Sequence, residues 1–175
     1  MAGEKQFVMP FHTIITLILI AVMVLPPLYY LPQLAWSQPP QEAAQDNPYI
    51  RAPTELVHVG DINIAYKRFG EGKPILFIPG TGQTKEAWEP TLLSQLVETN
   101  HTVIIFDNRG MGETTVGTRP FSIEQFANDT AGLLDALQIE KADVFGLSLG
   151  TFIAQELTLN YPEKVDRLIL HATYC

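Results

Sequence analysis

The chain has 175 residues, of which 46% are hydrophobic and 17% are charged, and its net charge is −8. This length allows one domain with a sizeable apolar core, and the negative charge gives no support for nucleic-acid binding. The single cysteine, Cys175, excludes an internal disulfide and any CxxC metal or redox site. None of the four histidines has a neighbour at a metal-ligand spacing, so no metal site is expected.

The N-terminal part carries an apolar segment, residues 11–30, which has the length needed to cross a bilayer. Two interpretations stay open. Lys5 before the segment and Ala35-Trp-Ser37 after it fit a secretory signal peptide and its cleavage site, whereas the length and the distal aromatic residues fit an uncleaved anchor. Either one would place the rest of the chain across the membrane. We therefore predict that residues 1–36 are a signal peptide or membrane anchor, and that the globular part is extracytoplasmic, either exported or membrane-anchored.

Residues 37–53 are rich in Pro, Gln and Ala and lack apolar periodicity, which predicts a linker. The globular domain is then expected over residues 54–175. It opens with two alternating runs, 55–59 and 62–69, around Gly60-Asp61. This pattern predicts a β-hairpin.

After the hairpin, apolar strand patterns alternate with helical patterns. Strands are predicted at 75–78, 101–106, 144–147 and 165–171, and helices at 86–98, from Ser122 to about Leu137, and from Leu149 to about Asn160. Ser122 and Gln125 have the spacing of a capping box. The alternation implies an α/β fold with a mostly parallel sheet that helices cover on both faces.

Residues 146–150 read Gly-Leu-Ser-Leu-Gly, between an apolar strand and an amphipathic helix. This is the strand–turn–helix context in which G-x-S-x-G marks a nucleophile, and the sharp turn would expose the Ser148 hydroxyl above the sheet edge. Gly146 and Gly150 would remove side chains that collide where strand and helix approach. A serine nucleophile also needs a base and oxyanion donors, and the N–H of Leu149 at the helix start is one expected donor.

Two more loops follow parallel strands, at the edge where open α/β sheets bind ligands. They read Pro79-Gly-Thr-Gly-Gln-Thr and Asp107-Asn-Arg-Gly-Met-Gly. The first is rich enough in glycine to aim backbone N–H groups inward and so to supply the second oxyanion donor. It lacks the G-x-x-x-x-G-K-[ST] pattern, which disfavours nucleotide binding.

With these three motifs in this order, residues 56–173 resemble the α/β-hydrolase superfamily. The family's oxyanion loop usually begins His-Gly, where this chain has Pro79-Gly80, and the resemblance assigns the second donor to the N–H of Thr81. The turn that starts at Asp107 matches the family's D-x-R-G-x-G-x-S pattern with threonine last. The resemblance implies a structural role there, with a buried arginine contact and no catalytic role for Asp107. It also implies a small-molecule acyl substrate and no cofactor.

The family's catalytic acid and histidine follow the nucleophile in the chain. Asp166 is expected at the wrong end of its strand, and nothing in the sequence orients His171. We therefore expect a truncated α/β-hydrolase fold, a fragment lacking the acid and histidine, with an exposed apolar strand at 165–171 and little activity of its own. The expected function is hydrolysis of an ester or related acyl substrate. Two alternatives stay open, a non-catalytic membrane-tethered binding protein on a degenerate hydrolase fold and a cofactor-free haloperoxidase-like enzyme.

Overall fold

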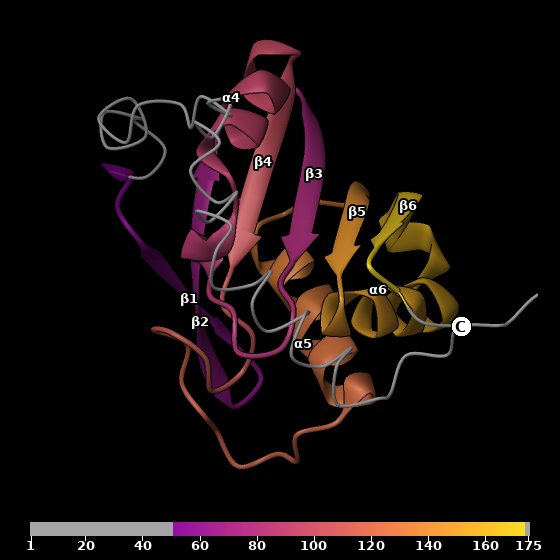
Figure 1. Cartoon of the computed structure of the whole chain (residues 1–175). Coiled ribbons are helices and arrows are strands. Elements are labelled where there is room, and N and C mark those ends of the chain that lie inside the picture. Colours follow the sequence, from indigo (N-terminus) through magenta and orange to yellow (C-terminus); the bar gives the residue numbers. More distant parts are fainter. Residues whose placement is uncertain (1–50, 174–175) are drawn as a thin grey trace, which may run out of the picture. The chain divides into compact units, whose positions relative to one another are not determined.

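The structure, a computed structural model, describes residues 51–173 (Figure 1). The predicted signal or anchor at 1–36 and most of the predicted linker lie outside the described residues. Within residues 51–173, no helix has both the length and the apolar character needed to cross a bilayer.

The described residues form one six-stranded sheet in the order β1-β2-β4-β3-β5-β6. The elements in chain order are β1 (Glu55–Val59), β2 (Ile62–Phe69), β3 (Lys73–Ile78), the 3₁₀ turn η2 (Lys85–Ala87), α4 (Pro90–Glu98), β4 (His101–Phe106), α5 (Ile123–Ala136), β5 (Ala142–Leu147), α6 (Leu149–Asn160), the 3₁₀ turn η3 (Pro162–Lys164) and β6 (Val165–His171). The β1–β2 and β2–β4 pairs are antiparallel, and the β4–β3, β3–β5 and β5–β6 pairs are parallel. The predicted hairpin and the mostly parallel sheet are confirmed.

Two apolar clusters cover the two faces of the sheet. On one face, Leu76 and Ile78 of β3 belong to the cluster that contains the buried side chains of α5 and α6. On the other face, Ile75 and Phe77 belong to the cluster that contains Leu93 of α4. Successive residues of a strand point to opposite faces, so β3 has to be apolar at every position. This explains why the pattern at 75–78 is a continuous apolar run.

The predicted helix at 86–98 is wrong in its first turn. The chain forms only the short η2 turn, and α4 begins at Pro90 with Glu89 as its N-cap, whose carboxylate accepts a hydrogen bond from the Leu92 N–H at 3.0 Å. Proline has no N–H and clashes with the preceding turn, so it begins a helix here and cannot continue one.

The predicted capping box of α5 forms only in part. The Ser122 hydroxyl accepts from the N–H of Gln125 at 3.1 Å, as the spacing predicts. The Gln125 side chain, however, donates to Asp129 Oδ1 at 2.8 Å in place of returning to the cap. A buried carboxylate gains more from a charge-assisted hydrogen bond than the helix start gains from a neutral one.

Among the described strands, β6 lies at an edge of the sheet. Its apolar side chains Leu168, Ile169 and Leu170 are between 36% and 41% exposed. The predicted exposed apolar strand is therefore present, and an unpaired edge with this composition favours association with other chains.

Candidate active site

Ser148 occupies the sharp turn between β5 and α6. Its backbone has φ 51° and ψ −115°, a conformation that costs free energy for a residue with a side chain. Its neighbours hold it there, since the Ser148 N–H donates to the His171 carbonyl at 3.0 Å and its carbonyl accepts from the Thr151 hydroxyl at 2.7 Å. Among the described residues, nothing forms a hydrogen bond with the Ser148 hydroxyl.

Two glycines allow α6 to start so close to the sheet. A Cβ added to Gly146 would lie 2.4 Å from the Gly150 carbonyl oxygen, and one added to Gly150 would lie 2.2 Å from the carbonyl oxygen of Ile78. Both contacts are with backbone atoms, which cannot rotate away. The first turn of α6 therefore rests directly on the ends of β5 and β3.

The loop after β3 forms a tight turn against Ser148. The Gln83 N–H donates to the Gly80 carbonyl at 3.2 Å, and Gly82 takes a positive φ of 69°. A Cβ added to Gly80 would lie only 3.3 Å from Ser148 Cβ. The N–H groups of Thr81 and Leu149 have no acceptor among the described residues. The structure thus leaves two unused backbone donors on the two segments that meet at Ser148.

The loop after β4 is held by a buried carboxylate, that of Asp107. Its oxygens accept from the Lys85 N–H at 2.7 Å, from Lys85 Nζ at 3.0 Å and from the Glu113 N–H at 2.9 Å. Burial disfavours the Lys85 ammonium, but its bonds to Glu113 and Asp107 outweigh that effect and raise its pKa. All of these contacts shape the loop, in agreement with the structural role that the resemblance implies for Asp107.

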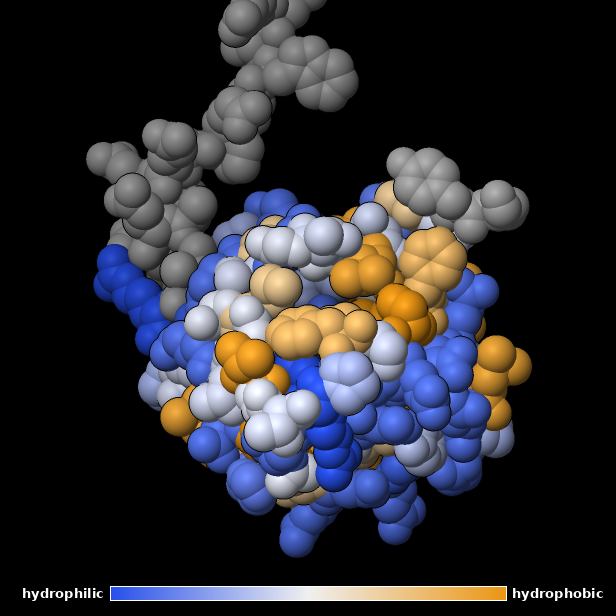
Figure 2. Space-filling view, turned by 90° about the horizontal axis from the view of Figure 1, so that it is seen from below, coloured by the Kyte–Doolittle hydropathy of each residue, from blue (hydrophilic) through white to orange (hydrophobic). Residues whose placement is uncertain are grey.

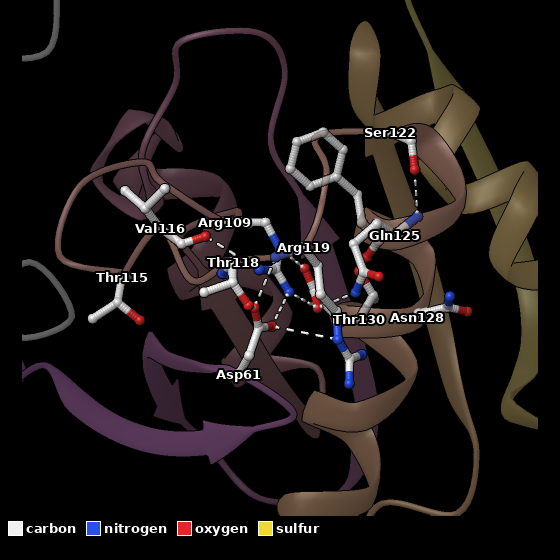
Figure 3. A network of polar contacts seen from close by, with 12 residues as sticks. Asp61, Arg109, Thr115, Val116, Thr118, Arg119, Ser122, Gln125, Asn128 and Thr130 are labelled. Atoms are coloured by element: carbon white, nitrogen blue, oxygen red, sulfur yellow. Dashed lines mark hydrogen bonds and ion pairs between the residues drawn. The ribbon is translucent and has the colours of Figure 1, made fainter.

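Arg109, only 1% exposed, forms the predicted buried arginine contact (Figure 3). It donates to both carboxylate oxygens of Asp129 at 2.8 and 2.7 Å, to Asp61 at 2.8 Å and to the Val116 carbonyl at 3.1 Å. The hydrogen bond from Arg109 is the largest cause that lowers the pKa of Asp61. The network ties the hairpin turn and the loop after β4 to α5. The sequence analysis did not predict Asp61 and Asp129 as partners of Arg109. They lie 48 and 20 positions away from it along the chain, and no local pattern marks contacts at such separations.

Asp166 lies near the amino-terminal ends of the parallel strands, whereas Ser148 lies at their carboxyl ends. It pairs with Lys73, the first residue of β3, at 2.7 Å, and this contact lowers the pKa of its carboxyl. His171 ends β6 opposite Leu147, but its imidazole stacks on Phe145 with ring centroids 6.0 Å apart. Within residues 51–173, neither side chain forms a hydrogen bond with Ser148. No three His, Cys, Asp or Glu side chains of this range gather closely enough to hold a metal ion.

The face at the carboxyl ends of the parallel strands is partly apolar. Figure 2 looks onto this side of the described domain and shows hydrophobic side chains gathered across it. Among the exposed large hydrophobic residues are Val116 and Phe121 of the loop after β4 and Phe152 of α6, at 57%, 54% and 42% exposure. Ser148, between β5 and α6, lies at this same end of the parallel strands.

Comparisons with known proteins agree with this geometry. The family model of the alpha/beta hydrolase fold matches residues 73–175. A putative non-heme bromoperoxidase, BpoC, of Mycobacterium tuberculosis is 40% identical over 64% of this chain and 42% of that protein. A putative carbamate hydrolase, RutD, of Azorhizobium caulinodans is 36% identical over 65% of this chain and 42% of that protein.

Solved structures match in the same way. A laboratory-evolved variant of potato epoxide hydrolase superposes with a TM-score of 0.65 at 32% identity, over 70% of this chain and 40% of that one. An alpha/beta hydrolase fold protein from Chitinophaga pinensis gives a TM-score of 0.65 at 30% identity, over 70% of this chain and 44% of that one. The match spans about two fifths of the length of these relatives. The chain belongs to the alpha/beta hydrolase fold family.

Proposed function

We propose that the protein is a serine hydrolase of ester or related small acyl substrates, with Ser148 as its nucleophile. The observation that carries this proposal is the strained backbone of Ser148, φ 51°, which leaves its hydroxyl unbonded at the carboxyl edge of the sheet. A fold that needed only to be stable would gain from a glycine at this position. A relative named as a rhodomycin D methylesterase, 29% identical over 65% of the chain, and the putative carbamate hydrolase support acyl chemistry.

In the proposed reaction, the Ser148 oxygen attacks the substrate carbonyl carbon while its proton passes to a base, and the carbonyl electron pair moves onto the oxygen. Collapse of this intermediate expels the alcohol, which takes the proton from the base, and water then releases the acid from Ser148. The N–H groups of Leu149 and Thr81 donate to the oxyanion that develops, and the N-terminal end of α6 adds its positive dipole. Neither N–H has an acceptor among residues 51–173, which supports the assignment of both as donors. Gly146 and Gly150 contribute by letting α6 start beside the nucleophile.

We further propose that the base and the acid that activate Ser148 are not among residues 51–173. The only histidine near the turn, His171, directs its imidazole onto Phe145, and Asp166 is paired with Lys73 at the far edge. Without a base, a serine hydroxyl is a poor nucleophile at neutral pH. We expect the 175-residue chain by itself to turn over esters slowly, since loss of triad members costs on the order of 10⁶ in kcat.

A fluorophosphonate probe tests the nucleophile directly, because it reacts with activated serines and stays attached. We expect mass spectrometry of the full-length gene product to place the label on Ser148, and Ser148→Ala to abolish labelling. Ser94→Ala, a serine on α4, is the matched control and should leave labelling unchanged. A label on another serine, or none at all, would refute the assignment.

The similarity to the putative bromoperoxidase favours a second candidate, a cofactor-free haloperoxidase-like activity at the same serine. A halide-dependent oxidation assay separates the two functions, because ester hydrolysis needs no halide. A non-catalytic binding protein is the outcome indicated if neither activity nor labelling is found.

We also propose that residues 1–36 act as a signal peptide or membrane anchor, supported by the apolar run at 11–30. Cell fractionation of the protein with and without residues 1–36 tests this proposal. An unchanged distribution would contradict it.

A further inference from the structure

The peptide between Pro79 and Gly80 is held at both of its polar ends by side-chain amides. Asn108 Nδ2 donates to the Pro79 carbonyl oxygen at 3.3 Å, and Gln83 Oε1 accepts from the Gly80 N–H at 2.9 Å. These two bonds come from different loops, yet they act on one rigid plane. Asn108 is 4% exposed, so its amide has a buried and well-defined position.

This peptide needs an external hold, because the residue that follows it is a glycine. Gly80 has no Cβ to restrict rotation, and an added Cβ would lie 2.9 Å from Gln83 Oε1, 3.2 Å from the Leu147 carbonyl oxygen and 3.3 Å from Ser148 Cβ, so it would displace the Gln83 amide that holds the peptide. The close approach to Ser148 therefore requires the residue type that stiffens the backbone least. The next peptide, which carries the Thr81 N–H, is held through its own carbonyl, because the Gly80 carbonyl oxygen accepts from the Gln83 N–H at 3.2 Å. Gln83 therefore contacts both peptides of Gly80.

We propose that Asn108 and Gln83 are positioning residues that lock the Pro79–Gly80 peptide and thereby hold the Thr81 N–H beside Ser148. This inference rests on the proposed function for its catalytic meaning, but the lock itself is a property of the fold. The proposal gives the loop after β4 a role at the site. Asn108 follows Asp107 in this loop, and the Asp107 carboxylate is held by hydrogen bonds from Lys85 and Glu113.

Amide hydrogen exchange of the 175-residue chain tests the lock without any need for activity. Gln83→Met removes the acceptor and Asn108→Leu removes the donor, each with little change in volume. We expect either variant to speed exchange of the Gly80 amide by about 2- to 10-fold, the range for loss of one hydrogen bond. Gln83→Glu keeps an acceptor and should preserve the protection of Gly80.

The matched controls are Gln95→Met, on the exposed side of α4, and Asn128→Leu, which loses a 2.7 Å bond from the Tyr161 hydroxyl. Both should leave Gly80 exchange unchanged. Melting temperatures of all variants separate local opening from a loss of global stability. Unchanged exchange at Gly80 in Gln83→Met or Asn108→Leu would overturn the lock.

The second arm measures the rate of fluorophosphonate labelling at Ser148 in the full-length gene product. We expect both variants to label about 10- to 100-fold more slowly, as a displaced oxyanion donor predicts, with the controls unchanged. Faster exchange together with an unchanged labelling rate would overturn the positioning role. If the wild-type protein is not labelled, the proposed function fails, and the exchange data decide the lock by themselves.

Discussion

The buried arginine allows the sharpest test of how the site loops are held. Replacing Arg109 with methionine keeps most of the side-chain volume but leaves the Asp129 carboxylate, whose side chain is 6% exposed, without the cation that neutralises it. Removing one partner of a buried ion pair costs about 3–5 kcal/mol, because the remaining charge stays desolvated. For a domain of this size, that loss lowers the melting temperature by roughly 10–20 °C.

Arg119 provides the matched control. It also faces Asp61, with Nε 3.7 Å from the carboxylate, but its side chain is 51% exposed. Because solvent screens exposed pairs, Arg119→Met should cost less than about 1 kcal/mol. Urea denaturation followed by circular dichroism measures both variants.

The double variant Arg109→Met with Asp129→Leu adds a second comparison. It removes both buried charges, so it should recover much of the stability lost by the single change. If Arg109→Met fails to fold, a folded double variant still shows that the Asp129 charge causes the loss of stability. Equal losses for Arg109→Met and Arg119→Met, or no recovery in the double variant, would refute the argument that burial makes this contact strong.

Three further predictions follow from the same structure. Gly150→Ala should lower the free energy of unfolding by about 3 kcal/mol or more, because the added Cβ would lie 2.2 Å from the Ile78 carbonyl oxygen. Gly82→Ala has open space around it and should lower that free energy only by the roughly 1–2 kcal/mol of a strained φ. Equal melting temperatures for the two variants would contradict the steric argument. Asp61 has a pKa held well below its ordinary value by Arg109, so its contribution to stability is complete above about pH 3.9 and is lost as the pH falls through the folded-state pKa. Asp61→Asn should therefore flatten the acid limb of the curve of unfolding free energy against pH, and an unchanged slope below pH ~4 would contradict the shift. Ile169→Lys, on the exposed β6 edge, should reduce concentration-dependent light scattering, and scattering equal to that of the wild type would show that this edge does not drive association.

Local sequence pattern was enough to predict most of the elements. Period-two alternation around Gly60-Asp61 marks the hairpin, and a continuous apolar run marks β3, because both signals arise from which side chains a strand buries. The Gly-Leu-Ser-Leu-Gly motif predicts a turn between strand and helix, because such a turn leaves room only for glycine at its flanks. These features depend on residues within a few positions of each other.

What the sequence by itself determined is therefore the alternation of strands and helices, the family, and the position of Ser148 at a strand–helix junction. Only the tertiary structure decided the partners of Arg109, the hold of Asn108 and Gln83 on the Pro79–Gly80 peptide, and the direction of the His171 imidazole. Those contacts join segments up to 48 residues apart, as between Arg109 and Asp61. No periodicity predicts them, because all but the local Gly80–Gln83 bond exist only after folding has brought separate segments of the chain together.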